Sequence, residues 1–151
     1  MQPLSREHHH GLLFVWKIRV GLAASLSPYR IAKYCDWFWN TQLKHHMEQE
    51  EATLTKVLPA EHPLLVNMLD DHAAIRSKIA QVIEDPTNEG LKRLADIVYY
   101  HVRFEEHFLF PAIEKTATAE QLAQLGKELE QNNVPQTEWP DEFWARRPVA
   151  A

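Results

Sequence analysis

Apolar side chains recur at helical spacing along almost the whole chain of 151 residues, and no stretch shows the sustained alternation typical of a half-buried strand. The chain has only four glycines, which favours long helices over many turns. Prolines and capping residues break the pattern and predict helices over 4–24, 28–58, 63–84, 87–110 and 118–133. We therefore predict an all-α protein: an antiparallel, up-down four-helix bundle with a short fifth helix.

Local signals set these helix ends. Ser27 and Pro28 are typical of an N-cap followed by a first-turn proline. Thr118 and Gln121 fit a capping box at the start of the fifth helix. Pro111 is expected to kink or end the fourth helix, because proline has no amide hydrogen and clashes with the preceding turn.

The chain is expected to form one domain with an appendage. Residues 1–133 form the helical bundle domain, and residues 134–151 form an irregular C-terminal tail that contains three prolines and two tryptophans. Because Trp139, Phe143 and Trp144 lie in this tail, it either folds over the bundle or offers a surface to a partner. Folding back is the favoured outcome, and a homodimer formed through the aromatic tail is the alternative.

Composition excludes several classes of protein. A single cysteine, Cys35, rules out an intramolecular disulfide framework and a cysteine-based zinc cluster. Sixteen basic and 21 acidic residues give a net charge of −5, which disfavours nucleic acid as a partner. No apolar run approaches the roughly 20 residues that cross a bilayer, and no signal peptide is visible, so we expect a cytoplasmic protein without a membrane partner.

The nine histidines are the most informative residues of the chain. Because each residue of a helix turns by about 100°, the face on which each side chain lies can be calculated. One histidine falls on the apolar stripe of each long helix, and two of these histidines have a glutamate one turn later on the same stripe. The predicted inward residues are His9, His46, Glu50, His72, His101 and Glu105. The other histidines near them, His8, His10, His45 and His107, are expected to face solvent or flank the core.

The neighbours on each stripe come from the same calculation. His9 shares its stripe with Leu13 and Trp16, and Phe108 continues the stripe of His101 and Glu105.

Two buried glutamates beside four imidazoles favour a shared metal site. A buried carboxylate costs several kcal/mol unless it is paired or bound to a metal. The spacing His-x-x-x-Glu occurs at His46/Glu50 and at His101/Glu105, and it places nitrogen and oxygen donors about 6 Å apart on one helix face. Mixed imidazole and carboxylate ligands suit iron, manganese or zinc better than calcium, and two glutamates that can bridge favour two ions.

A structural role is the alternative for each of these residues. A single histidine on an apolar stripe is more often a hydrogen-bonded core residue than a ligand, and His-x-x-x-Glu pairs are common on solvated helices. Four such histidines in register with two glutamates are difficult to explain in this way, so the set favours a metal site.

The fourth helix carries the most specific pattern. The sequence from His101 to Pro111 resembles the H-x-x-x-E-E-x-x-L-F-P signature of the hemerythrin-like HHE cation-binding domains. His46 to Glu50 is similar to the second-helix H-x-x-x-E of that family, and His72 and His9 match its third-helix and first-helix histidines. The resemblance covers roughly residues 4–114 and implies an oxo- or hydroxo-bridged, non-haem di-iron centre in a four-helix bundle. Family members bind dioxygen reversibly, sense oxygen, iron or nitric oxide, or repair damaged iron centres.

One position departs from the family pattern. The oxygen-carrying hemerythrins have a second histidine one turn after the first on the third helix, where this chain has Arg76. Of about twelve coordination positions on two six-coordinate ions, the family's ligands fill about eleven and those of this chain about ten. The extra open coordination position could be taken by water, Glu106, His45 or substrate. Arg76 either pairs with a glutamate or, if it reaches the site, favours bound anions, so sensing or redox chemistry is expected rather than simple oxygen storage.

Three classes of function follow. The leading hypothesis is a di-iron protein that binds dioxygen, nitric oxide, peroxide or a related small ligand for sensing, buffering or iron handling. The second is a di-iron enzyme that reduces peroxide or nitric oxide or repairs iron–sulfur centres. The third is a helical interaction module whose histidines serve packing. Hydrolases and nucleotide-dependent enzymes are disfavoured, because no nucleophile–base motif or phosphate-binding glycine loop is present.

Overall fold

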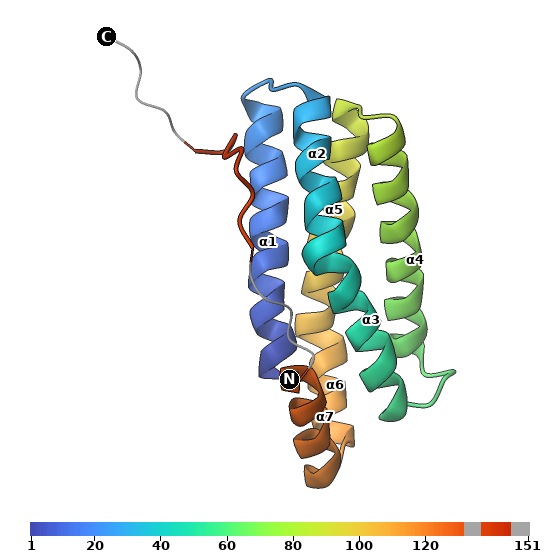
Figure 1. Ribbon diagram of the computed structural model, residues 1–151. Coiled ribbons are helices and arrows are strands. Elements are labelled where there is room, and N and C mark those ends of the chain that lie inside the picture. Colours follow the sequence, from blue (N-terminus) through green and yellow to red (C-terminus); the bar gives the residue numbers. More distant parts are fainter. Residues whose placement is uncertain (132–136, 146–151) are drawn as a thin grey trace.

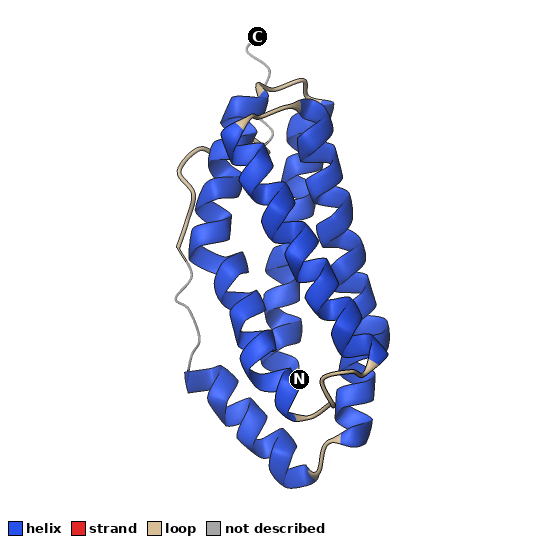
Figure 2. Ribbon diagram, turned by 90° about the vertical axis from the view of Figure 1, so that its right-hand side faces the viewer, coloured by secondary structure: helices blue, strands red, loops and turns tan. Residues whose placement is uncertain are grey.

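The chain folds as an all-helical protein, as the periodicity predicts. The computed structural model describes residues 1–131 and 137–145, and every regular element among them is a helix (Figure 2). The elements in chain order are α1 (Gln2–Ala23), α2 (Pro28–Phe38), the π-helical turn η1 (Trp39–Leu43), α3 (Lys44–Thr53), the 3₁₀ turn η2 (Leu54–Lys56), α4 (Pro63–Glu84), α5 (Asn88–Phe104), the π-helical turn η3 (Glu105–Leu109), α6 (Phe110–Thr116) and α7 (Ala119–Gln131).

Four long helical rods lie side by side, and successive rods run in opposite directions (Figure 1). Two of the rods, α1 and α4, are single helices, whereas α2–η1–α3 and α5–η3–α6 are each continuous helical runs with a π turn inside. α1 packs mainly against α5, and α4 packs mainly against α5 and α2. α7 lies near the N-terminal end of α1 and contacts α1 and α3.

The helix boundaries follow the capping signals closely. α4 occupies Pro63–Glu84, as predicted. The capping box at α7 is formed: Thr118 N donates to Gln121 Oε1 at 2.9 Å, and Gln121 N donates to Thr118 Oγ1 at 3.0 Å. Ser27 precedes α2 as predicted, although its side chain makes no capping hydrogen bond. The predicted end of the fifth helix, near residue 133, lies outside the described residues.

Pro111 does not end or break the fourth rod, which continues as α6 to Thr116. The irregularity comes just before the proline, as the π turn η3 over Glu105–Leu109. Proline lacks an amide hydrogen, and its ring crowds the carbonyl group of the turn before it. A π turn holds one extra residue and is wider, so it accommodates both effects without ending the helix.

The core consists of two apolar clusters with a polar layer between them. The first cluster includes Phe14, Met47, Ile75 and Val98, and the second is built around residues near the opposite ends of the rods. Members of the second cluster include Leu4, Leu54, Met68 and Ile113. Every rod places a buried histidine between the two clusters, and two of the rods add a glutamate: His8, His46, Glu50, His72, His101 and Glu105. Burial of these polar groups needs an explanation, because apolar layers lie on both sides of them.

The described part of the tail, residues 137–145, packs on the first cluster. Phe143 is only 7% exposed, and Trp139 and Trp144 pack against the same cluster. Arg30 donates two hydrogen bonds to Asp141, at 2.8 and 2.7 Å. The ring of Phe143 lies against Gly21, where an added Cβ atom would come within 3.0 Å of it. The tail aromatic residues are therefore covered by their own chain.

Candidate metal centre

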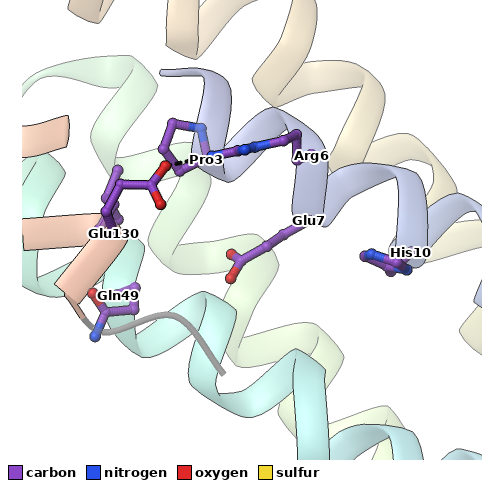
Figure 3. Close-up of a pocket in the computed structure, with 7 residues that line it drawn as sticks. Pro3, Arg6, Glu7, His10, Gln49 and Glu130 are labelled. Carbon is purple, nitrogen blue, oxygen red and sulfur yellow. Dashed lines mark hydrogen bonds and ion pairs between the residues drawn. The ribbon is translucent and has the colours of Figure 1, made fainter. Parts of the chain in front are cut away.

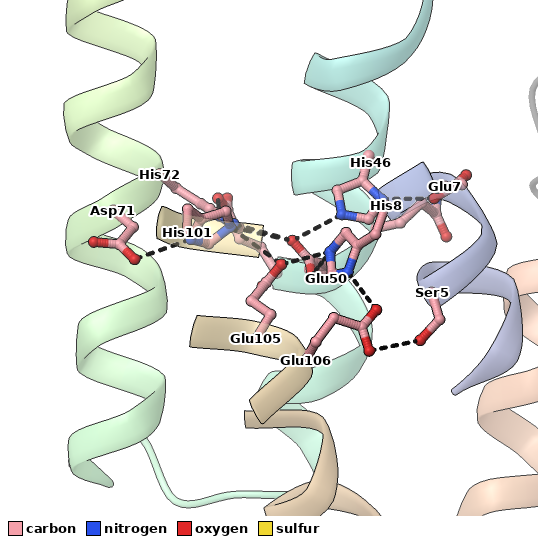
Figure 4. Close-up of polar contacts among 12 residues, drawn as sticks. Ser5, Glu7, His8, His46, Glu50, Asp71, His72, His101, Glu105 and Glu106 are labelled. Atoms are coloured by element: carbon pink, nitrogen blue, oxygen red, sulfur yellow. Dashed lines mark hydrogen bonds and ion pairs between the residues drawn. The ribbon is translucent and has the colours of Figure 1, made fainter. Parts of the chain in front are cut away.

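Six buried polar side chains from the four rods converge between the two apolar clusters (Figure 4). α1 supplies His8, α3 supplies His46 and Glu50, α4 supplies His72, α5 supplies His101, and the first residue of η3 is Glu105. Glu50, His72 and Glu105 are completely buried. Five of the six residues predicted to point inward meet here: His46, Glu50, His72, His101 and Glu105.

The prediction that His9 lies inward is wrong, because His9 is exposed and His8 takes its place. The buried face of α1 contains Gly11 and Gly21, which have no side chain to contribute to an apolar pattern. At Gly11, an added Cβ atom would lie 3.6 Å from Val102 Cγ2, so α1 and α5 approach closely there. The visible apolar stripe on α1 is offset from this face, and Trp16 on that stripe is 50% exposed.

The π turn η3 changes the face of the residues that follow it. A π turn contains one extra residue, so downstream side chains shift by about 100° relative to an uninterrupted α-helix. Phe108, predicted to continue the stripe of Glu105, is 61% exposed, whereas Leu109 and Phe110 are buried. π turns inside α-helices occur frequently at functional sites, and in this rod the turn begins at a residue of the cluster.

The inner atoms form two groups that share both glutamates. One group contains His8 and His46 with Glu50 and Glu105, and the other contains His72 and His101 with the same two glutamates. In each group the donor atoms lie within 4.8 Å of one another. Two carboxylates are thus common to two nitrogen pairs, and each of the two groups could hold a metal ion.

The Nε2 atoms of all four histidines point at these glutamates. His8 Nε2 lies 2.8 Å from Glu105 Oε1, and His101 Nε2 lies 3.2 Å from the same atom. His72 Nε2 and His46 Nε2 lie 3.1 and 3.3 Å from Glu50 Oε1. All four imidazoles therefore present the same ring nitrogen to one centre.

The Nδ1 atoms point outward, each to a different carboxylate. The four pairs are Glu106–His8 at 2.7 Å, Glu7–His46 at 2.7 Å, Glu51–His72 at 2.6 Å and Asp71–His101 at 3.0 Å. Because an ionised carboxylate only accepts hydrogen bonds, each Nδ1 carries the hydrogen. With Nδ1 held by an outer carboxylate, Nε2 is the nitrogen that a metal ion would take in place of a proton, and outer carboxylates hold metal-binding histidines in the same way.

The four outer hydrogen bonds form a closed ring around the rods. Each outer carboxylate reaches a histidine on a different rod: Glu7 joins α1 to α3, Glu51 joins α3 to α4, Asp71 joins α4 to α5, and Glu106 joins η3 to α1. Each rod therefore gives one carboxylate and receives one. The ring fixes the orientation of every imidazole relative to its neighbouring helices.

The outer carboxylates had a signal in the sequence. Each is the immediate neighbour of an inward residue: Glu7 precedes His8, Glu51 follows Glu50, Asp71 precedes His72, and Glu106 follows Glu105. A neighbour lies about 100° around the helix from the inward face, which aims it toward the next rod. Of these four carboxylates, the sequence singles out only Glu106, as a candidate extra ligand of the metal. The structure instead places the Glu106 carboxylate on the outer side of His8.

Several inner atoms have no hydrogen-bond partner within the described residues. They are Nε2 of His46 and His101 and Oε2 of Glu50 and Glu105. A buried polar atom without a partner costs about 1–3 kcal/mol. Buried nitrogen and oxygen atoms that face one another without partners suit cations, so the residues fit a pair of metal ions.

Proton binding in the metal-free cluster follows from burial and charge. Burial lowers the pKa of His46, but Glu50 and the hydrogen bond to Glu7 outweigh it, so the net pKa is well above its usual value. Burial likewise lowers the pKa of His101, while Glu105 and Asp71 raise it to about 10. For Glu50, burial raises the pKa, but His46 and its other partners hold it well below the usual range. Protons and metal ions therefore compete for the same nitrogen atoms.

Arg76 lies beside the cluster and not within it. Its guanidinium forms an ion pair with Glu51 Oε2 at 2.9 Å, and this oxygen also accepts a hydrogen bond from His72 Nδ1. Of the two roles left open for Arg76, the structure supports pairing with a glutamate. Its positive charge reaches the centre only through Glu51 and His72.

A small pocket opens onto the cluster. It has a volume of about 20 Å³, and three of the four histidines line it: His8, His46 and His101. A second pocket of about 170 Å³ lies between α1, α3 and α7 and is lined by Pro3, Arg6, Gln49 and Glu130, among others (Figure 3). Glu7 and His10 line both pockets, so the two are neighbours on α1.

No protein-family model, curated protein or solved structure shows a significant match to this chain. Within the described ranges, none of the helices has the length and apolar character needed to span a membrane. The structure thus shows an all-helical chain with a buried histidine–glutamate cluster that could hold metal ions.

Proposed function

We propose that this chain is a hemerythrin-like four-helix bundle that holds two iron ions and binds dioxygen, nitric oxide, peroxide or a related small ligand. In this proposal His8 and His46 bind one ion, His72 and His101 bind the other, and Glu50 and Glu105 bridge the two.

The observation that carries the proposal is the uniform orientation of the four imidazoles. Histidines that serve packing have no reason to present the same nitrogen to one point and the other nitrogen to four separate carboxylates. The cluster has two inner and four outer carboxylates, and this negative charge suits two metal cations. The resemblance of residues 101–111 to the fourth-helix signature of the family supports the same reading.

Iron is proposed because mixed nitrogen and oxygen ligands suit it, and because the family implied by the resemblance uses it. Manganese and zinc share these ligand preferences and are the alternatives that elemental analysis distinguishes. An iron pair, when bound, supplies reversible electron transfer and open positions for a small ligand. The protein residues hold the donor atoms in place, and the apolar walls of the small pocket limit the size of the ligand.

Anaerobic loading with ferrous iron tests the proposal. We expect about two irons per chain by elemental analysis, and near-ultraviolet charge-transfer bands after exposure to air. Reversible uptake of about one equivalent of ligand per iron pair would support a binding protein. A chain that binds no metal under these conditions would refute the proposal.

Reduction of peroxide or nitric oxide is the second candidate function. Each ion would receive two histidines, two shared carboxylates and a bridging oxygen, which leaves about one of six positions open on each ion. Steady turnover of either substrate, lost in a His101→Ala variant, would favour the enzyme over the binding protein.

A further inference from the structure

Gln42 is a half-buried polar residue that the proposed metal centre does not use. It lies in the π turn η1, one turn before His46 on the same rod. Its side-chain Nε2 is buried and has no hydrogen-bond partner within the described residues. A buried amide donor without a partner costs free energy. An acceptor atom bound beside Gln42 would remove this cost.

The same side chain lines the small pocket beside the cluster. The other polar residues that line the pocket are Glu7, His8, His10, His46 and His101. The carboxylate of Glu7 pairs with His46 Nδ1, whereas Nε2 of His46 and of His101 lacks a partner within the described residues. The volume of about 20 Å³ only slightly exceeds the roughly 10–15 Å³ that one water molecule needs, so the pocket suits a ligand little larger than water.

The remaining walls of the pocket are apolar. Gly11, Phe38, Leu43, Val98 and Val102 line the pocket, and none of their side chains has a hydrogen-bonding group. Gly11 has no side chain, which leaves space between α1 and α5 at this point. An acceptor atom in the pocket thus faces the amide of Gln42 on one side and the cluster on the other.

We propose that Gln42 selects the ligand of this site by donating a hydrogen bond to a small anion, such as azide or a peroxide anion, bound between its amide and the metal centre. This inference rests on the proposed function, because the cluster must hold metal for the ligand to bind. A side-chain amide cannot lose its proton at physiological pH, so it favours ligands that carry an acceptor atom or a negative charge.

The test compares azide binding by the iron-loaded, air-oxidised protein with that of matched variants. Gln42→Leu and Gln42→Met remove the donor and keep a side chain of similar size. Gln49→Leu is the control, because Gln49 lies on the same rod but lines the other pocket. Iron content and circular dichroism are measured for each protein before azide titration.

We expect all four proteins to hold about two irons per chain. The azide Kd should rise about tenfold to a hundredfold in both Gln42 variants and stay within about twofold in Gln49→Leu.

Three results would overturn the inference in distinguishable ways. Equal azide affinity in wild type and both Gln42 variants would show that Gln42 contacts only water. Loss of iron from the Gln42 variants would make it a structural residue of the metal centre. Absence of iron from the wild type would refute the proposed function together with this inference.

Discussion

The substitution Asp71→Asn tests whether the outer carboxylates control metal binding. Asp71 Oδ2 accepts a hydrogen bond from His101 Nδ1 at 3.0 Å, and His101 belongs to only one of the two donor groups. Asparagine keeps the size and an acceptor oxygen but removes the charge. The matched control is Asp70→Asn, because Asp70 is the preceding residue and is exposed.

The structure sets the expected magnitude. Loss of an outer partner of a metal-binding histidine typically weakens metal binding about 10- to 100-fold. The side chain of Asp71 is one-third exposed, and asparagine can still accept the hydrogen bond, so we expect the lower end of this range. A tenfold loss corresponds to about 1.4 kcal/mol.

Anaerobic titration with ferrous iron, followed by calorimetry, measures the effect on each ion. For Asp71→Asn we expect one ion to bind about tenfold more weakly, and the ion held by His8 and His46 to keep most of its affinity. Asp70→Asn should bind both ions as the wild type does. Equal affinities in the two variants would refute the reasoning that the ring of carboxylates holds the imidazoles for metal.

Three further predictions concern the metal-free fold. Phe143→Ala should lower the free energy of unfolding by about 3 kcal/mol and Tm by roughly 6–12 °C, because the ring packs on its own chain. The oligomer size in light scattering should stay the same. An unchanged Tm would show that the tail contact contributes nothing to stability. Burial lowers the pKa of His101, but Glu105 and Asp71 raise it to about 10, above its unfolded value near 6.5. The stability this gives should be complete below about pH 6.5 and be lost as pH rises through about 10. Urea unfolding at pH 6.5, 8.5 and 10.5 measures this loss, and a constant free energy of unfolding would contradict it. Burial raises the pKa of the Cys35 thiol, so a thiol reagent at pH 8 should label it only in denaturant, and rapid labelling of the native protein would contradict its burial.

The helix boundaries are predictable because their signals are local. Pro63 begins α4, and the hydrogen bonds between Thr118 and Gln121 start α7, as the sequence indicates. Proline and capping residues act on backbone hydrogen bonds within one turn, so these signals can be recognised from the sequence alone. The inward positions on α3, α4 and α5 follow from the same kind of pattern.

The face of α1 and the shift after η3 depend on packing between helices. Gly11 and Gly21 are buried because α5 and the tail approach them closely, yet glycine is invisible to an apolar pattern. The stripe calculated from Trp16 therefore selects His9 over His8. Pro111 predicts an irregularity in this rod but not that it takes the form of a π turn before the proline, so the exposure of Phe108 does not follow from regular helical geometry.

Substitution of the neighbouring residues His8 and His9 is the sharpest test of whether the inward-facing histidines of this chain bind metal. Elemental analysis of iron-loaded His8→Ala and His9→Ala compares a buried and an exposed histidine at neighbouring positions. We expect about two irons per chain in the wild type and in His9→Ala, and about one or fewer in His8→Ala. Full iron content in His8→Ala, or its loss in His9→Ala, would contradict the account.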